Sequence, residues 1–200
     1  MIQSSEVRWF FHYEPFAPSL FFEADRSQEG RIDWYAYPCD ERSGVKIREH
    51  RLEAKLLINS LGRHDFSDAT GNIEHWQKWS VELPEDDFPS DAQLRFAGWV
   101  SVAKLRYLRI FANDGSSIYE VDDYPDNGGQ FEWTKLTALG QKWWTIGFES
   151  FGPETELDRN LSALVNHAFE DKLIPAALET SNSFGYPKWL KQIQSSCKLP

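Results

Sequence analysis

Basic residues occur at alternating positions inside segments that have the pattern of β-strands. Lys46 and Arg48 are two residues apart, as are Lys104 and Arg106. Because successive side chains of a strand point to opposite faces of a sheet, the two members of each pair share one face. Lysine is depleted in strands, and ammonium and guanidinium groups gathered on one face are suited to binding phosphate oxygens.

Carboxylates are interspersed among these basic strands. Glu82 lies near the end of the segment that contains Lys78, and Asp122 and Glu149 lie in two other strand segments. Carboxylate oxygens are hard ligands that bind magnesium or manganese. A polar interior with cationic side chains and a few carboxylates would therefore fit a phosphate chain chelated by a divalent cation. The same groups can catalyse phosphoryl transfer by positioning and charge neutralisation.

The elements that must position these side chains are predominantly strands. From residue 6 to residue 150 the hydrophobic pattern has a period of two, interrupted by Gly- and Asn-rich turn signals. We predict eight or nine strands, at residues 6–13, 33–37, 45–49, 51–58, 73–83, 99–110, 116–123, 131–137 and 142–150. Their apolar faces must be covered by other parts of the chain.

Two helices are predicted. The first is short, spans residues 90–96 and is capped by Ser90 or Asp91. The second follows Gly152-Pro153, where the hydrophobic period changes to that of an amphipathic helix over residues 156–173, with Thr155 as its N-cap. The remaining tail contains several aromatic residues, so we expect it to be held on the body of the protein.

The predicted fold is mainly β (α+β). It is an antiparallel, eight- or nine-stranded, tunnel-like barrel formed by residues 4–150, with a C-terminal helix and tail, residues 153–200, packed on the outside. All 200 residues are assigned to one domain. If the charged strand faces curve inward, they line a polar tunnel.

The order of motifs resembles the CYTH-like, or triphosphate tunnel, superfamily, which includes thiamine, inorganic and RNA triphosphatases and class IV adenylyl cyclases. Its opening Glu-x-Glu-x-Lys motif resembles Ser4-x-Glu6-x-Arg8, and its final Glu-x-Glu motif resembles Gly147-x-Glu149. The intervening basic and acidic strands resemble the segments around Lys46-x-Arg48, Lys55, Lys78, Lys104-x-Arg106 and Glu120-Val121-Asp122. Ser4 and Gly147 replace carboxylates of the family pattern, which weakens the expected metal site.

The resemblance implies roles for particular residues. The ligand would be a triphosphate-bearing molecule or polyphosphate, cleaved, if the site is active, by a magnesium- or manganese-dependent phosphohydrolase. The implied catalytic residues are Glu6, Arg8 and Lys104. The implied ligand-binding residues are Lys46, Arg48, Lys55, Lys78 and Arg106, and the implied metal ligands are Glu6, Glu82, Asp122 and Glu149.

Composition restricts the other possibilities. The formal net charge of −10 disfavours broad binding to nucleic acids. Cys39 and Cys197 have no metal-ligand spacing, and neither a secretion signal nor a membrane-spanning run is apparent, so we expect a cytoplasmic protein with no membrane partner. The pattern does not indicate an oligomeric state or the organic part of the ligand.

Three other interpretations fit parts of the pattern. The charged faces could be the solvated outer faces of an ordinary sandwich. The protein could be a non-catalytic anion-binding module of the same fold, or a calycin-like barrel that carries an apolar ligand. Basic side chains inside the barrel would favour the tunnel, and aromatic side chains inside would favour the carrier.

Overall fold

The computed structural model describes residues 2–23, 29–37, 40–84, 88–170 and 176–196. The strands are β1 (Ile2–Phe11), β2 (Glu29–Tyr35), β3 (Ser43–Arg48), β4 (Arg51–Asp65), β5 (Thr70–Glu82), β6 (Val100–Asn113), β7 (Ile118–Val121), β8 (Gly128–Ala138) and β9 (Gln141–Phe151). The helices are α1 (Asp91–Phe96), α2 (Leu157–Phe169) and α3 (Tyr186–Ser196). Single 3-10 turns occur at Pro18–Leu20, Glu154–Glu156 and Thr180–Asn182.

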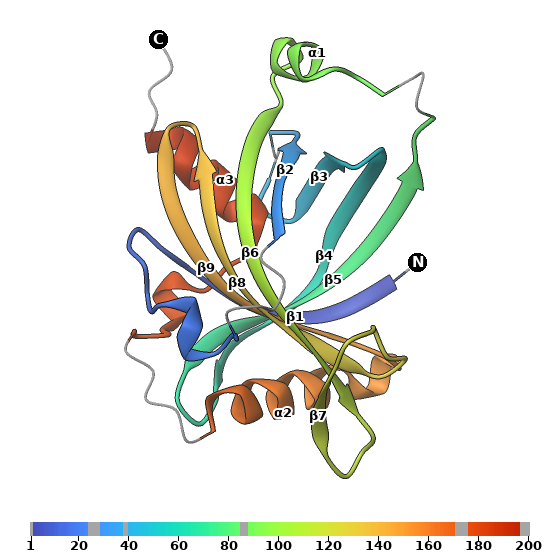
Figure 1. Ribbon diagram of the computed structural model, residues 1–200, viewed down its shortest axis with the longest axis vertical. Helices are drawn as coiled ribbons and strands as arrows, with labels where there is room; N and C mark the ends of the chain where they lie inside the picture. The colour runs from blue at the N-terminus through green and yellow to red at the C-terminus, as the bar shows by residue number, and fades with distance from the viewer. Residues whose placement is uncertain (1, 24–28, 38–39, 85–87, 171–175, 197–200) are drawn as a thin grey trace.

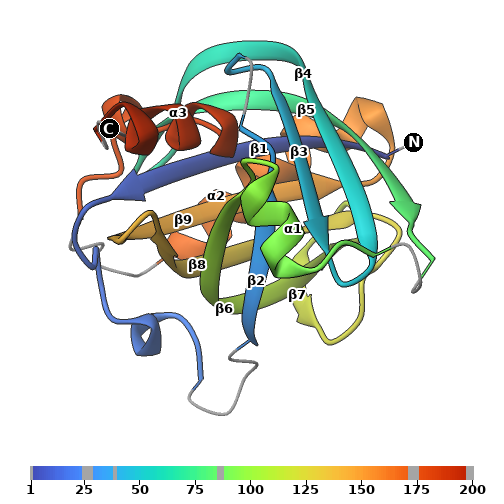
Figure 2. The ribbon, with the colours of Figure 1, turned by 90° about the horizontal axis from the view of Figure 1, so that it is seen from above.

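The strands form a closed antiparallel barrel, which confirms the predicted fold class. Eight strands follow the order β2-β3-β4-β5-β1-β9-β8-β6, and β6 pairs back with β2 to close the ring. The ninth strand, β7, pairs only with the C-terminal part of β6 and lies outside the ring. Figures 1 and 2 show the strongly curved strands around a common interior.

Local irregularities allow the strands to curve. The β4–β5 pair shifts register between Leu57 and Asn59 and again between Ser60 and Gly62. Such bulges bend a strand and increase its twist. Gly62 has a φ of 73°, a conformation that glycine adopts with little strain. β4 continues beyond these shifts to Asp65, well past the predicted strand end at residue 58.

Helix α2 covers the outer face of several strands. In β1, the side chains of Val7, Trp9 and Phe11 point outward and are buried in the same cluster as Leu161 and Leu164 of α2. Figure 1 shows α2 beneath the barrel. The helix begins one residue later than predicted, after the 3-10 turn that contains Thr155, and ends at Phe169. The predicted residues 171–173 lie outside the described part of the chain.

A smaller apolar cluster lies under α1. Leu94 packs against the outward-facing Trp34 of β2 and Ile47 of β3. Ser90 caps the helix, and its side chain and that of Gln93 form a reciprocal capping box. This confirms the predicted short helix and its cap.

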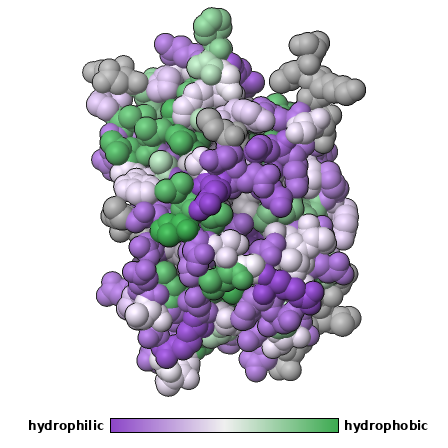
Figure 3. Space-filling model, turned by 180° about the vertical axis from the view of Figure 1, so that it is seen from behind, coloured by the Kyte–Doolittle hydropathy of each residue, from purple (hydrophilic) through white to green (hydrophobic). Residues whose placement is uncertain are grey.

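Part of the outer surface stays apolar and exposed. On β4 and β5, Leu56, Leu61 and Val81 are all exposed. Figure 3 shows the face opposite that of Figure 1, which is mostly polar but interrupted by patches of hydrophobic residues.

The tail forms a helix, α3, that the sequence analysis does not predict. The expected contact with the body is present, because Phe184, Trp189 and Leu190 are buried. They pack against side chains on the inner face of the barrel, among them Phe10 and Trp143. The tail therefore contributes to the interior of the barrel as well as covering it.

No helix in the described ranges is long and apolar enough to cross a membrane. Cys39 and Cys197, on which the expected compartment partly depends, both lie outside the described residues.

Candidate functional site

The barrel encloses a cavity of about 480 Å³. Its wall is formed by strands from around the ring and by the start of α3. Eight of the described lining residues are basic and five are acidic. The basic residues are Arg8, Arg31, Lys46, Arg48, Lys55, Lys78, Lys104 and Arg106, and the acidic residues are Glu6, Glu53, Glu74, Glu132 and Glu149.

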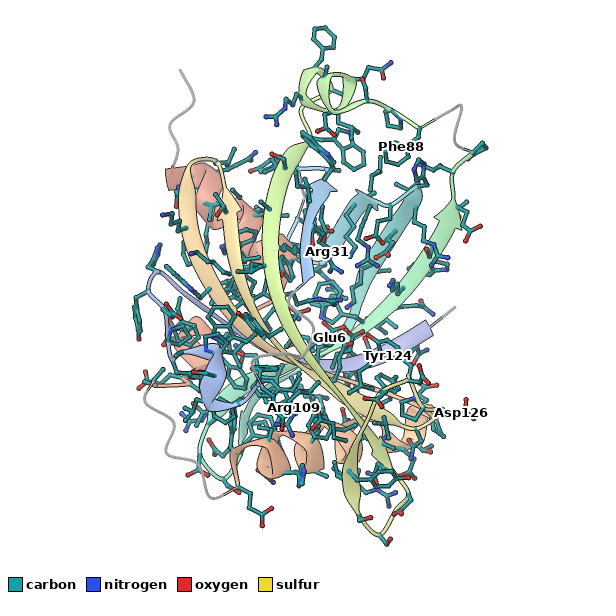
Figure 4. The ribbon with its side chains drawn as sticks, viewed as in Figure 1. Glu6, Arg31, Phe88, Arg109, Tyr124 and Asp126 are labelled. Carbon is teal, nitrogen blue, oxygen red and sulfur yellow. The ribbon has the colours of Figure 1, made fainter. Side chains whose placement is uncertain are left out.

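The structure brings most of the predicted site residues together. All eight basic or acidic residues assigned to catalysis or ligand binding line this cavity, and so does Glu149, one of the implied metal ligands. In Figure 4, Glu6 and Arg31 lie in the space enclosed by the strands, and Tyr124 extends from the loop after β7. The charged strand faces therefore point inward, and the sandwich interpretation is wrong.

Glu82 and Asp122 lie away from the cavity. Glu82 is the last residue of β5, where the strand extends past the enclosed space, and it forms an exposed ion pair with Arg51. Asp122 is exposed just after β7, the strand that is outside the closed ring. Neither carboxylate can share a site with Glu6 and Glu149, so the predicted placement of these two metal ligands is wrong.

Asp33 is the most deeply buried carboxylate and is surrounded by cations. One of its oxygens lies 2.8 Å from Nζ of Lys104, and Lys46 and Arg31 are 3.8 and 3.3 Å away. Lys104 also donates a hydrogen bond of 2.8 Å to the hydroxyl of Tyr35. Burial by itself would raise the pKa of Asp33, but these cations hold that pKa well below its usual range.

Glu53 is a second carboxylate shared by several cations. Its oxygens lie 2.9 Å from Lys46, 3.0 Å from Arg48 and 3.3 Å from Lys78. Burial again opposes ionisation, yet the surrounding lysines and Arg48 lower the pKa of Glu53 to about 2. The same cluster affects Lys46, because burial lowers the pKa of its ammonium group to about 8.

Glu132 balances two further cations. Arg8 donates a hydrogen bond of 2.7 Å to one oxygen of Glu132, and Arg106 donates one of 3.4 Å to the other. Together, Asp33, Glu53 and Glu132 pair with seven different lysines and arginines. These three carboxylates and their seven cations form one wall of the cavity with an excess of positive charge, which is called the cationic wall below. Its cations are Arg8, Arg31, Lys46, Arg48, Lys78, Lys104 and Arg106.

On β5, β1 and β9, carboxylates lie opposite other carboxylates. Glu6 is directly opposite Glu74 on β5 and Glu149 on β9, and all three side chains line the cavity. We call these three residues the carboxylate row. Lys55 binds both Glu6 and Glu149, the latter at 3.8 Å.

Like charges opposite each other on neighbouring strands are destabilising, and in this row they add to the effect of burial on the pKa values of Glu6 and Glu74. Burial, and then the charge of Glu149, raise the pKa of Glu6. Burial raises the pKa of Glu74 to about 7, although the indole N–H of Trp76 donates a hydrogen bond of 3.1 Å to it. Burial also opposes ionisation of Glu149, but Lys55 and Lys78 lower its pKa.

Gly147 has a specific reason to be glycine. It faces Arg8 across the β1–β9 pair, and a Cβ at position 147 would lie 2.4 Å from Cζ of Arg8. That distance is far below van der Waals contact, so the guanidinium occupies the space that any side chain would need. A second carboxylate at this point, as in the family pattern, is incompatible with the position of Arg8.

The residues present do not fit the four-carboxylate metal site that the sequence predicts. Only Glu6 and Glu149 of that set reach the cavity, and both contact Lys55. In the part of the chain that the structure describes, no three His, Cys, Asp or Glu side chains are grouped so that they could hold a metal ion.

Several cavity residues are missing from the predicted set. Arg31 and Tyr35 flank Asp33 at alternating positions. Alternation could have identified Tyr35 within the predicted strand, and Arg31 had the strand been predicted to begin before residue 33. Glu53 could have been found from its alternation with Lys55. Tyr186 belongs to α3, and no local pattern shows that it lies inside a barrel.

The chain matches no protein-family model, no curated protein and no solved structure in the comparisons made. The resemblance to triphosphate tunnel proteins therefore stays a prediction, and inference about function rests on the cavity.

Proposed function

We propose that this protein binds a small molecule with several linked phosphates, either a triphosphate-bearing compound or inorganic polyphosphate, inside its barrel. The observation that carries the proposal is the enclosed excess of basic side chains: among the described residues, eight line the cavity, against five acidic ones that line it and Asp33 buried behind them. Burying unbalanced charge is costly, so such an excess is best explained by an anion that the cavity accommodates.

The distribution of the ion pairs supports this proposal. Each carboxylate of the cationic wall is shared by two or three cations, so phosphate oxygens could add to these groups without displacing the carboxylates. Arginine and lysine form strong charge-assisted hydrogen bonds with phosphate. A multiply charged ligand would contact several of them at once.

The interpretation of the protein as a carrier of an apolar ligand is less well supported. Trp76, Tyr186 and Phe151 do contribute aromatic surface to the cavity. However, an apolar molecule there would desolvate the charged side chains around it without offering them hydrogen bonds, which is unfavourable. The proposal is for binding and does not include hydrolysis, because Glu82 and Asp122 lie outside the cavity.

Calorimetric titration with tripolyphosphate tests this proposal. We expect binding that weakens as salt is added, and a loss of about tenfold in affinity for Lys78→Met, because one charge-assisted contact is removed. Lys142→Met is the matched control, since Lys142 is an exposed lysine outside the cavity. Absence of binding at millimolar tripolyphosphate, with or without magnesium, would contradict the proposal.

A parallel assay measures phosphate release from tripolyphosphate with magnesium or manganese. We expect no release above the rate without protein. Turnover that is lost in Glu6→Gln would show instead that the carboxylate row supports catalysis.

A further inference from the structure

The inner face of the barrel changes character along its strands. On β1, Glu6 and Arg8 line the cavity, and the next inward residue is the buried Phe10. On β6, Arg106 and Lys104 are followed in the same direction by Val102. Beyond the charged cavity, therefore, the interior is filled by apolar side chains.

Helix α3 completes this apolar end. Trp189, Leu190 and Ile193 are exposed by no more than 1% and belong to the same cluster as Phe10. The ring of Phe10 stacks on Trp189 at 5.4 Å. The backbone N–H of Phe184 donates to the carbonyl of Arg8, which fixes the start of the helix against β1. This end of the barrel is closed by packed side chains.

The exposure of the lysines shows where the cavity opens. The side chain of Lys104, next to the apolar end, is only 4% exposed. The side chains of Lys78 and Lys55 are 32% and 30% exposed. The cavity is therefore more open to solvent near Lys78 and Lys55 than near Lys104, and packed side chains close it beyond Lys104.

Tyr186 lies at the closed end among the deepest cations. Nζ of Lys104 is 4.2 Å from the centre of its ring, and Cζ of Arg8 is 5.1 Å away. The hydroxyl of Tyr186 is buried and has no hydrogen-bond partner within the described residues. An unpaired buried hydroxyl is unfavourable, and an anion bound next to Arg8 and Lys104 would supply its acceptor.

We propose that the ligand binds end-on, with a terminal phosphate at the closed end against Arg8, Lys104 and the hydroxyl of Tyr186. The rest of the phosphate chain, or the organic group, leaves the cavity past Lys78. This inference rests on the proposed function and narrows its ligand class to molecules with a free terminal phosphate. Internal phosphates of a long chain, a ring or a nucleic acid strand are excluded because they cannot reach the closed end.

Long-chain polyphosphate provides the main test. End-on binding predicts one protein per chain end whatever the chain length, measured by light scattering or analytical ultracentrifugation at saturation. Capping both ends with a bulky amine through phosphoramidate bonds leaves the internal phosphates intact and should weaken binding by about tenfold or more. Equal affinity for capped and free chains, or a stoichiometry that rises with chain length, would overturn the inference.

The same experiment separates this inference from the proposed function. If capped chains bind as well as free ones, the anion-binding proposal stands and only the end-on mode is wrong. If neither these chains nor tripolyphosphate bind, the proposed function itself fails.

A conservative variant tests the placement of the terminal phosphate. Tyr186→Phe keeps the ring against Lys104 and removes only the hydroxyl, and we expect it to weaken tripolyphosphate binding about three- to tenfold. Tyr119→Phe is the control, because Tyr119 is an exposed tyrosine on β7 that does not line the cavity. Wild-type affinity in Tyr186→Phe, or an equal loss in both variants, would overturn the placement at the closed end.

Discussion

The cationic wall and the carboxylate row use the same residue types and have opposite electrostatic behaviour. In the cationic wall, each carboxylate faces several basic groups, so the pKa values of Asp33 and Glu53 fall despite burial. In the carboxylate row, β-sheet register places Glu6 opposite another carboxylate on either side. Burial, reinforced by these like charges, raises the pKa values of Glu6 and Glu74, whereas Lys55 and Lys78 lower the pKa of Glu149. The arrangement of the charges, more than their number, determines which groups stay ionised.

The largest expected effect comes from breaking the deepest ion pair of the cationic wall. Lys104→Met leaves Asp33 fully buried without its closest cation, which should lower the free energy of unfolding by about 3 kcal/mol. Urea denaturation measures this loss. Lys78→Met is the control, because its half-buried pair with Glu53 should contribute about 1 kcal/mol or less. Equal losses of unfolding free energy in the two variants would mean that burial does not distinguish the Lys104–Asp33 pair from the Lys78–Glu53 pair.

Arg8 lies between the cationic wall and the carboxylate row, and a substitution at Gly147 tests its position. Gly147→Ala forces the guanidinium to move away from Glu132, and we expect a loss of about 1–3 kcal/mol in the free energy of unfolding. Gly30→Ala on β2 is a matched control, since a Cβ there meets no atom within 4 Å. If both substitutions have the same small effect, Arg8 does not occupy the space above Gly147.

The carboxylate row should have a distinctive pH dependence. The native protein retains a proton on Glu74 up to a pKa of about 7, whereas the unfolded chain loses it near 4.5. The native state therefore binds more protons between these values, and stability falls as the pH rises through this window. Glu74→Gln removes that fall, so its stability relative to wild type should rise by about 1 kcal/mol or more between pH 5 and 8.

Glu53→Gln is the corresponding variant in the cationic wall, and its pH dependence should differ from that of Glu74→Gln. The pKa of Glu53 is about 2 in the native protein, below the window. Its contribution to stability is lost only as the pH falls towards that value, so the variant should show a steady deficit in the lower part of the range from pH 5 to 8. The deficit should shrink only near pH 8, where Lys46, whose pKa is already about 8, loses its proton more easily without Glu53. Thermal unfolding across this range measures both variants. Parallel curves for wild type and Glu74→Gln would contradict the raised pKa of Glu74.

The smallest effect is expected outside both regions. The ion pair between Arg51 and Glu82 is exposed, so Glu82→Gln should change the free energy of unfolding by less than about 1 kcal/mol. It should also leave tripolyphosphate binding unchanged, as measured by calorimetry. Loss of tripolyphosphate binding in this variant would show that Glu82 belongs to the binding site.

The strand pattern made the barrel and most of the cavity predictable. Alternation along β3 places Lys46 and Arg48 on one face with Val45 and Ile47 on the other, and this local rule holds in the structure. The rule fails at strand ends. Glu82 has the correct parity but lies past the enclosed space, because parity gives the face of a strand and not the position along the barrel.

The helical tail shows a second limit of local patterns. Its aromatic residues predict burial, but they do not indicate whether Trp189 packs on the outer or the inner face. Tyr186 therefore could not be assigned to the cavity from the sequence, although it contacts Arg8 and Lys104.

The sequence by itself determined which side chains share a strand face, because a period of two is a property of the local backbone. It thereby determined eight or nine strands, the shared faces of the basic residues and the covering role of α2, whereas closure of the barrel decided that those faces point inward. Only the tertiary structure decided strand register, barrel closure and the position of α3. These depend on contacts between residues far apart in the chain, such as Glu6 with Glu74 and Glu149, and such contacts determine which charges are neutralised and which end of the barrel is closed.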